Sequence, residues 1–155
     1  MSRTEDSATS GKTMFSAKLT CPLGDPTKNY VTSFKVEEGI LKVSQNFCTW
    51  EDFQIGRHAV VGSVMTGVGT FRPDGTWSAE GHDHGTLLNG DRYLGHWKEK
   101  GDPNGIRGTW KLLAGSGALE GITGEATFEE PAPKPGDTSV TAAVTGWYRL
   151  PNSRR

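Results

Sequence analysis

The chain has 155 residues, a length that suits one domain with a sizeable core. Hydrophobic residues make up 34% of the chain and glycine 21 of its positions, which disfavours a large helical bundle and favours a sheet protein with many turns. The formal net charge of −1, with no stripe of lysine and arginine among aromatic residues, indicates no nucleic-acid partner. There is no secretory signal pattern and no apolar run of membrane-spanning length, so we expect a cytoplasmic protein without a membrane partner.

We expect a disordered N-terminal tail over residues 1–13, a single domain over 14–150 and a C-terminal tail over 151–155. Alternating apolar and polar residues predict strands over 15–21, 29–36 and 40–48, with turn signals between them. The stretch 49–57 has no clean period and predicts a loop or a short helix. Its Trp50 and Phe53 either cover one mouth of the fold or cap the core.

Cys21 and Cys48 are the only cysteines, too few for a disulfide scaffold. We expect two reduced, partly buried thiols, with a single structural disulfide as the alternative.

A long run of valines and glycines predicts a strand over 58–71, and three further strands follow between Trp77 and Leu112. Strands over 122–129 and 139–150 complete the pattern, separated by a proline-rich connection at 130–137. Eight or nine antiparallel strands without a convincing helix predict an all-β fold. We prefer a closed antiparallel barrel of about eight strands with a central cavity over a sandwich, because closure removes exposed sheet edges.

The turn at Asn89-Gly90 sets the phase of the central strands. This dipeptide favours a two-residue type I′ hairpin, which places Leu88 opposite Asp91. A five-residue loop at 101–105 then sets the third strand, with Trp97 opposite Gly108. This register puts one set of side chains on the inner face: Glu80, His82, His84, Thr86, Tyr93, Trp97, Trp110 and Leu112.

Buried polar groups are costly unless they are paired, hydrated or in use, so these residues are the candidate site. We expect Glu80, His82 and His84 to transfer protons, and Tyr93 to orient a substrate through its hydroxyl. The expected substrate-binding residues are Trp97, Trp110, Leu112 and Thr86. Such a cavity suits isomerisation, cyclisation or elimination of a small, mostly apolar molecule without a cofactor.

Two alternatives remain open. His82-Asp83-His84 has the spacing of a His-X-His metal motif, with Glu80 as a third ligand and zinc or iron as the occupant. However, the barrels that use this motif place a glutamate four or five residues later, where this chain has Leu88 and Asn89. We therefore expect no metal. In the other alternative the histidines are ordinary interior residues, and the protein only binds a small hydrophobic or aromatic ligand.

The segment 115–128, Gly-Ser-Gly-Ala-Leu-Glu-Gly-Ile-Thr-Gly-Glu-Ala-Thr-Phe, resembles a signature of bacterial barrels in the allene oxide cyclase and dirigent-like superfamily. The resemblance covers roughly residues 60–130. It implies an eight-stranded antiparallel barrel with a cavity open at one end, and it makes a homo-oligomer plausible. No catalytic residue of those families matches a position here. We expect a cofactor-independent isomerase, cyclase or lyase, with a non-catalytic binding protein as the first alternative and a metal-dependent enzyme as the second.

Overall fold

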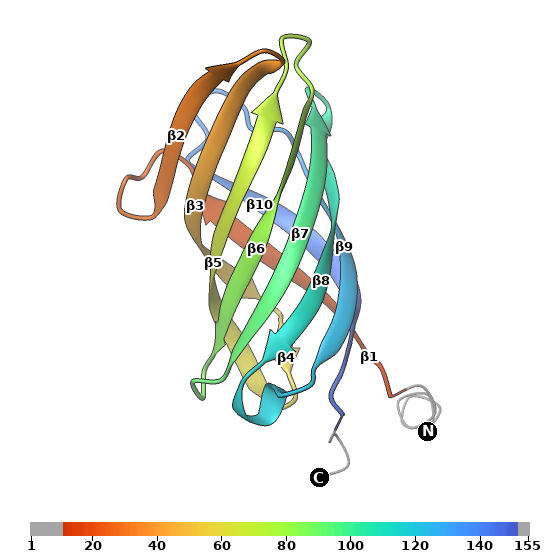
Figure 1. Cartoon of the computed structure of the whole chain (residues 1–155). Helices are drawn as coiled ribbons and strands as arrows, with labels where there is room; N and C mark the ends of the chain where they lie inside the picture. Colours follow the sequence, from red (N-terminus) through yellow and green to blue (C-terminus); the bar gives the residue numbers. More distant parts are fainter. Residues whose placement is uncertain (1–10, 152–155) are drawn as a thin grey trace.

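The computed structural model describes residues 11–151 and folds them into ten β-strands of one hydrogen-bonded sheet (Figure 1). The strands are β1 (Thr13–Pro22), β2 (Asn29–Val36), β3 (Gly39–Glu51), β4 (Gln54–Ile55), β5 (His58–Phe71), β6 (Trp77–Leu87), β7 (Arg92–Asp102), β8 (Gly105–Gly115), β9 (Thr123–Glu130) and β10 (Ser139–Arg149). The helical residues within this range form one 3-10 turn, η1 (Gly117–Leu119). No helix among residues 11–151 is long and apolar enough to cross a membrane. Residues 1–10 and 152–155, which belong to the expected tails, lie outside the described residues.

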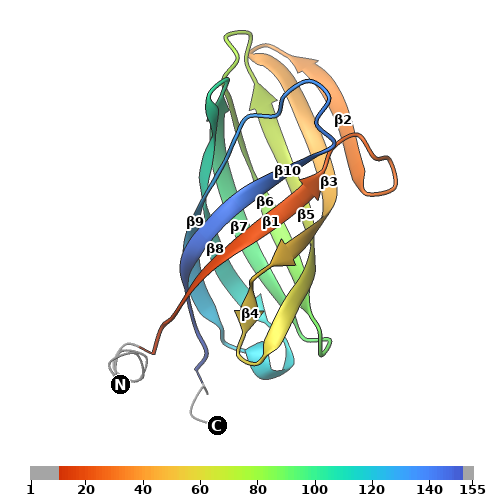
Figure 2. The same cartoon turned by 180° about the vertical axis from the view of Figure 1, so that it is seen from behind.

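Eight of the strands close into a barrel. Neighbours pair in the order β1, β10, β9, β8, β7, β6, β5 and β3, and β3 then returns to β1. β2 and β4 lie outside this ring and pair with β3 and β5, respectively. Figure 2 shows β1 and β10 side by side in the barrel wall. The all-β fold and the closed antiparallel barrel expected from the sequence are confirmed.

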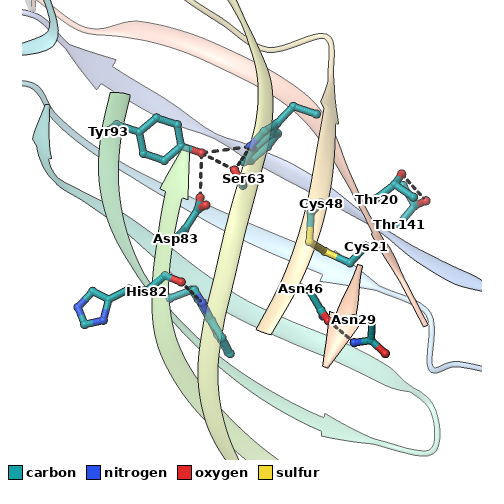
Figure 3. The surroundings of a disulfide bond; sticks show 12 residues. Thr20, Cys21, Asn29, Asn46, Cys48, Ser63, His82, Asp83, Tyr93 and Thr141 are labelled. Carbon is teal, nitrogen blue, oxygen red and sulfur yellow. Dashed lines mark hydrogen bonds between the residues drawn. A yellow bond between two sulfur atoms is a disulfide. The ribbon is translucent and has the colours of Figure 1, made fainter. Parts of the chain in front are cut away.

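The barrel closes at a short seam between β1 and β3. β3 pairs with β2 along residues 39–46, but with β1 at only three positions, residues 49–51. Cys21 and Cys48 occupy the next opposed position in this register, and their sulfur atoms form a disulfide (Figure 3). The expectation of two reduced thiols was wrong, because the register brings the two Cα atoms within 4.4 Å of each other. The disulfide therefore adds a covalent link at the position next to the three backbone pairs of the seam.

The two ends of the barrel differ. One end, called the closed end here, is plugged by buried apolar side chains: Phe53, Ile55, Leu119 and Ile122. The stretch 49–57, for which a loop or short helix was expected, continues β3, turns at Asp52 with a φ of 61° and then forms β4. Trp50 and Phe53 accordingly belong to the core. At the opposite, open end, the turns after β5 and β7 and the connection from β9 to β10 border a cavity.

The hairpin between β6 and β7 differs from the predicted one by one residue. Leu87 lies opposite Asp91, and its N–H donates to the Asp91 carbonyl oxygen at 2.8 Å. The connection therefore has three residues rather than two, and Gly90 adopts the positive φ, 95°, that such a hairpin needs at its last position. A slip of one residue exchanges the two faces of a strand. As a result, β6 turns its odd-numbered residues inward and its even-numbered residues outward.

The hairpin between β7 and β8 shifts by two residues, which leaves the faces unchanged. Asp102 pairs with Gly105 across a two-residue turn, where a five-residue loop was predicted. Trp97 consequently lies opposite Trp110 instead of Gly108. Because side chains alternate faces with a period of two, both tryptophans still point inward.

Replacing both cysteines tests the importance of the seam. The disulfide joins residues 27 positions apart, and cross-linking a loop of this size stabilises a protein by about 3.5 kcal/mol. We expect the double variant Cys21→Ser/Cys48→Ser to lose about 2–4 kcal/mol of unfolding free energy in urea denaturation. The wild-type protein held in reductant is the matched control and should unfold at the same urea concentration as the variant. An unchanged midpoint in both would show that three backbone pairs suffice to close the barrel.

Candidate active site in the barrel cavity

A cavity of ≈ 680 Å³ lies inside the barrel towards the open end. Of the residues lining it, Trp50, Asp83 and Trp110 lie nearest the closed end and form its floor. The turn residues Gly75 and Pro103 lie at its mouth. Six aromatic side chains contribute to its wall: Trp50, Phe71, Trp77, Trp97, Trp110 and Phe128. The cavity thus combines a largely apolar wall with a carboxyl group at its floor, the composition usual for a small-molecule site.

Asp83 is the most deeply buried polar side chain in the described residues, with 0% of its surface exposed. Its Oδ2 atom accepts hydrogen bonds from the Tyr93 hydroxyl at 2.8 Å and from Trp110 Nε1 at 3.1 Å. Its Oδ1 atom is buried and has no hydrogen-bond partner within residues 11–151. A buried carboxyl oxygen without a partner costs free energy, so Oδ1 is available for a ligand group or for the proton of the neutral acid.

A chain of hydrogen bonds leads to Asp83. Trp50 Nε1 donates to Ser63 Oγ at 2.7 Å and lies 3.1 Å from Tyr93 Oη. The Ser63 and Tyr93 hydroxyl oxygens are 3.0 Å apart. Because the one Tyr93 proton goes to Asp83, the Ser63 hydroxyl is the donor to Tyr93. Figure 3 shows the side chains of Ser63, Asp83 and Tyr93 directed towards one another.

The local backbone explains how these polar groups fit inside the barrel. Tyr93 packs over Gly85, its partner on β6, where a Cβ atom would lie 2.1 Å from the tyrosine ring. The residue opposite Asp83 is Gly95, and a Cβ there would lie 2.5 Å from Trp110 Nε1. Two glycines therefore clear the space through which Tyr93 and Trp110 reach the carboxylate.

Burial controls the acid–base properties of this group. Desolvation raises the pKa of Asp83 to about 6, against the opposing effect of the hydrogen-bond donors around it. Desolvation, and then the nearby Asp83 charge, raise the pKa of the Tyr93 hydroxyl well above its ordinary value. Tyr93 therefore stays a neutral donor over the physiological range, while Asp83 exchanges its proton close to neutrality. With Oδ2 already accepting two hydrogen bonds, the proton of neutral Asp83 belongs on Oδ1.

Two further carboxyl groups line the cavity nearer its mouth. Burial raises the pKa of Glu99, whose Oε2 accepts a hydrogen bond from Trp77 Nε1 at 3.3 Å. Burial, together with repulsion from Glu99, raises the pKa of Glu130 to about 7. Lys42 is the one cationic residue in the described part of the chain that lines the cavity, and its Nζ lies 4.2 Å from the centre of the Phe71 ring.

Four of the predicted site residues are inside the barrel, as expected. Trp97 and Trp110 line the cavity, and both are buried. Tyr93 is 1% exposed and lies behind the floor, where it contacts Asp83 rather than the open volume. Leu112 is buried with the core beneath the cavity, so its predicted contact with a substrate does not fit its position.

The other four predicted site residues are on the outer face of β6, and their predicted inward orientation was wrong. Glu80, His82 and His84 are exposed, and Thr86 is half-buried on the same outer face. The cause is the one-residue difference in the preceding hairpin. Figure 3 shows the His82 ring pointing away from Asp83.

On the outside, Glu80 and His82 form a surface cluster with His96. The Glu80 carboxylate lies 3.3 Å from His96 Nε2, and the His82 and His96 rings are 5.2 Å apart. Within residues 11–151 there is no group of three or more His, Cys, Asp or Glu side chains placed to hold a metal ion. The His-X-His motif is therefore part of the outer surface and not of the cavity.

Sequence reasoning missed Asp83, Ser63 and Trp50. A signal for Asp83 was present, because one face of β6 carries Trp77, Ala79, Gly81, Asp83, Gly85 and Leu87 and is the more apolar of the two. Ser63 lies on β5 and Trp50 on β3, and no pattern in the sequence joins either residue to Asp83.

Comparisons of the chain with protein-family models and with curated proteins find no match in either set.

Asp83→Asn tests the protonation behaviour of the buried carboxyl. Because the pKa of Asp83 is higher in the folded chain than its ordinary value of 3.8, the folded state holds the proton more tightly. The carboxyl therefore stabilises the fold below about pH 4, and this contribution is lost as the pH rises through about 6. The amide keeps an acceptor for Tyr93 and Trp110 but has no charge. We expect the free energy of unfolding of the variant to exceed that of wild type by on the order of 2–3 kcal/mol at about pH 8 and by little below about pH 4. Urea unfolding across this pH range measures the difference.

Glu125→Gln, on the outer face of β9, removes the same charge from the surface and should leave the stability profile close to wild type. A difference between wild type and Asp83→Asn that did not change with pH would contradict a raised pKa at Asp83.

Proposed function

We propose that this barrel binds a small, mostly apolar molecule in its cavity and holds one polar group of that molecule against Asp83. The observation that carries the proposal is Asp83, a residue of the cavity lining whose Oδ1 atom is buried and lacks a hydrogen-bond partner among the described residues. A hydrogen-bond donor on a ligand would satisfy it and would remove the cost of leaving it unpaired.

The shape and composition of the cavity support this function. Its volume of ≈ 680 Å³ falls in the range of sites that enclose small organic molecules. The tryptophan and phenylalanine rings in its wall offer apolar contact to a flat or alicyclic body. The polar chain from Trp50 to Asp83 holds the carboxylate in one position, so a ligand would meet a preorganised acceptor.

A second candidate function is acid–base catalysis on the bound molecule, as in an isomerase, cyclase or lyase without a cofactor. The observation that favours it is the pKa of Asp83, which burial brings to about 6, because a general base works best when its pKa lies near the working pH. Asp83 then takes the role that the sequence suggested for the outer histidines. Tyr93 acts as a positioning residue, since its hydroxyl donates to Asp83.

Three expectations from the sequence stay predictions. The likeness to allene oxide cyclase and dirigent-like barrels is compatible with an eight-stranded barrel and a cavity, and we propose it only as a guide to fold relatives. A homo-oligomer rests on the same likeness. The cytoplasmic location stays a prediction that the Cys21–Cys48 disulfide disfavours, because disulfides persist in oxidising compartments and are rare in the cytosol.

Filling the cavity tests the binding function. Ala142 on β10 is buried and lines the cavity, whereas its neighbour Ala143 is exposed on the outer face. We expect Ala142→Phe to occupy the binding volume and to weaken the binding of a neutral apolar fluorophore, N-phenylnaphthylamine, by about tenfold or more. The measurement is the rise in probe fluorescence on titration with protein.

Ala143→Phe places the same side chain on the opposite face and should bind the probe like wild type. Circular dichroism of each variant checks that the barrel is folded. If wild type did not bind the probe, or if both variants bound it equally well, the cavity would not be the binding site.

The catalytic candidate can be tested with a substrate that reports a reactive carboxylate in an apolar cavity. In 5-nitrobenzisoxazole a base removes the proton from the ring carbon next to nitrogen, the carbon–nitrogen bond becomes a nitrile, and the nitrogen–oxygen bond breaks to leave a coloured phenolate. We expect wild-type protein to accelerate this ring opening and Asp83→Asn to lose about tenfold or more of the added rate. Ala142→Phe should lose it as well, and Glu125→Gln should retain it. Equal rates of ring opening for wild type and Asp83→Asn would rule out Asp83 as the catalytic base.

A further inference from the structure

The charged side chains around the cavity are predominantly acidic. Asp83 lies at the floor, Glu99 and Glu130 lie between floor and mouth, and Asp102 lies at the rim. Among residues 11–151, Lys42 is the only basic residue that lines the same space. These carboxylates would repel an anionic ligand, whereas they would attract a cation into the cavity.

The position of Asp83 distinguishes a cation from a neutral ligand. Its ionised carboxylate is removed from water and keeps one oxygen without a hydrogen bond, which is the costly state of a buried charge. A neutral hydroxyl would satisfy Oδ1 but would leave the charge uncompensated. An ammonium group would both donate to Oδ1 and neutralise the charge, so it relieves more of the cost.

The aromatic wall suits the same class of ligand. Trp110 lines the cavity and donates its Nε1–H to Asp83 Oδ2, so its indole ring holds the carboxylate in place and adds apolar surface next to it. Trp97, directly across from Trp110 on β7, adds a second ring. Organic cations bind to aromatic faces, and they bind most strongly where water is excluded.

We propose that the ligand of this cavity is an organic amine in its protonated form, with an aromatic or alicyclic body and its ammonium group against Asp83 Oδ1. This inference rests on the binding function proposed above and specifies the chemical class of the ligand. The body of the amine occupies the apolar volume between Trp97 and the mouth. The carboxylates of Glu99 and Glu130, which lie nearer the mouth, attract the cation as it enters the cavity.

Three probes with the same ring test the inference: tryptamine, which is cationic, tryptophol, which is neutral, and indoleacetate, which is anionic. Isothermal titration of the intact protein at about pH 7.5 should give an affinity for tryptamine about tenfold or more above that for tryptophol, with indoleacetate the weakest. Asp83→Asn should bring the affinity for tryptamine down to that for tryptophol and leave tryptophol nearly unchanged. Glu125→Gln, which removes a charge from the outer face, should preserve the preference of wild type.

The outcomes separate this inference from the binding function. If tryptamine and tryptophol bind equally well and Ala142→Phe abolishes both, the cavity binds small molecules but does not select a cation. If the preference for tryptamine survives in Asp83→Asn, Asp83 is not the group that recognises the ammonium, and the inference is overturned. If no probe binds, or if Ala142→Phe changes nothing, the binding function and the inference fail together.

Discussion

Closure of the barrel between β1 and β3 is the constraint on which the cavity depends. Seven of the eight junctions in the ring are ladders of seven or more residue pairs, but β1 and β3 share three. The seam is short because β3 gives the first part of the same edge to β2. The Cys21–Cys48 disulfide lies where β3 passes from one partner to the other, and Cys21 also lines the cavity. One covalent bond thus reinforces the junction of the barrel wall that has the fewest backbone pairs.

The closed barrel then divides into a packed half and an open half, and the boundary between them is polar. Below the boundary, aromatic and aliphatic side chains fill the interior, with Phe53 stacked on Phe15 and in contact with Trp50. Above it, the glycine-rich inner faces leave a volume that side chains do not fill. Asp83 and Tyr93 sit at the boundary, each bonded to groups supplied by other strands. Such a layer has a strict geometry, since a displaced member would leave a buried polar group unpaired.

The architecture could be predicted from the sequence, and so could the inner faces of β7 and β8, because alternation along those strands is clear. The site could not, because the orientation of β6 depended on whether the turn at Asn89-Gly90 has two residues or three, and both lengths suit that dipeptide. The packing of large residues against glycine would have decided the question. In the true register Gly81 pairs with Trp97 and Gly85 with Tyr93, whereas the two-residue turn set both aromatic residues against larger partners. The hydrogen bonds of Trp50 and Ser63 depend on barrel closure between distant strands, which local patterns do not report.

The presence of a carboxylate at position 83 is better explained by function than by stability. Tyr93 and Trp110 each need an acceptor, and the carbonyl oxygen of an asparagine would supply one to both without a buried charge. Replacement of buried ionic groups by neutral or apolar ones is often neutral or stabilising. An aspartate there instead has to ionise in a desolvated site, and burial moves its pKa to about 6 as a consequence. Its Oδ1 atom has no hydrogen-bond partner among the described residues, and Asp83 belongs to the cavity lining, so the cost falls on a carboxyl group next to the proposed binding volume. A bound cation would offset that cost, so the electrostatics of the cavity floor agree with the ligand class proposed above.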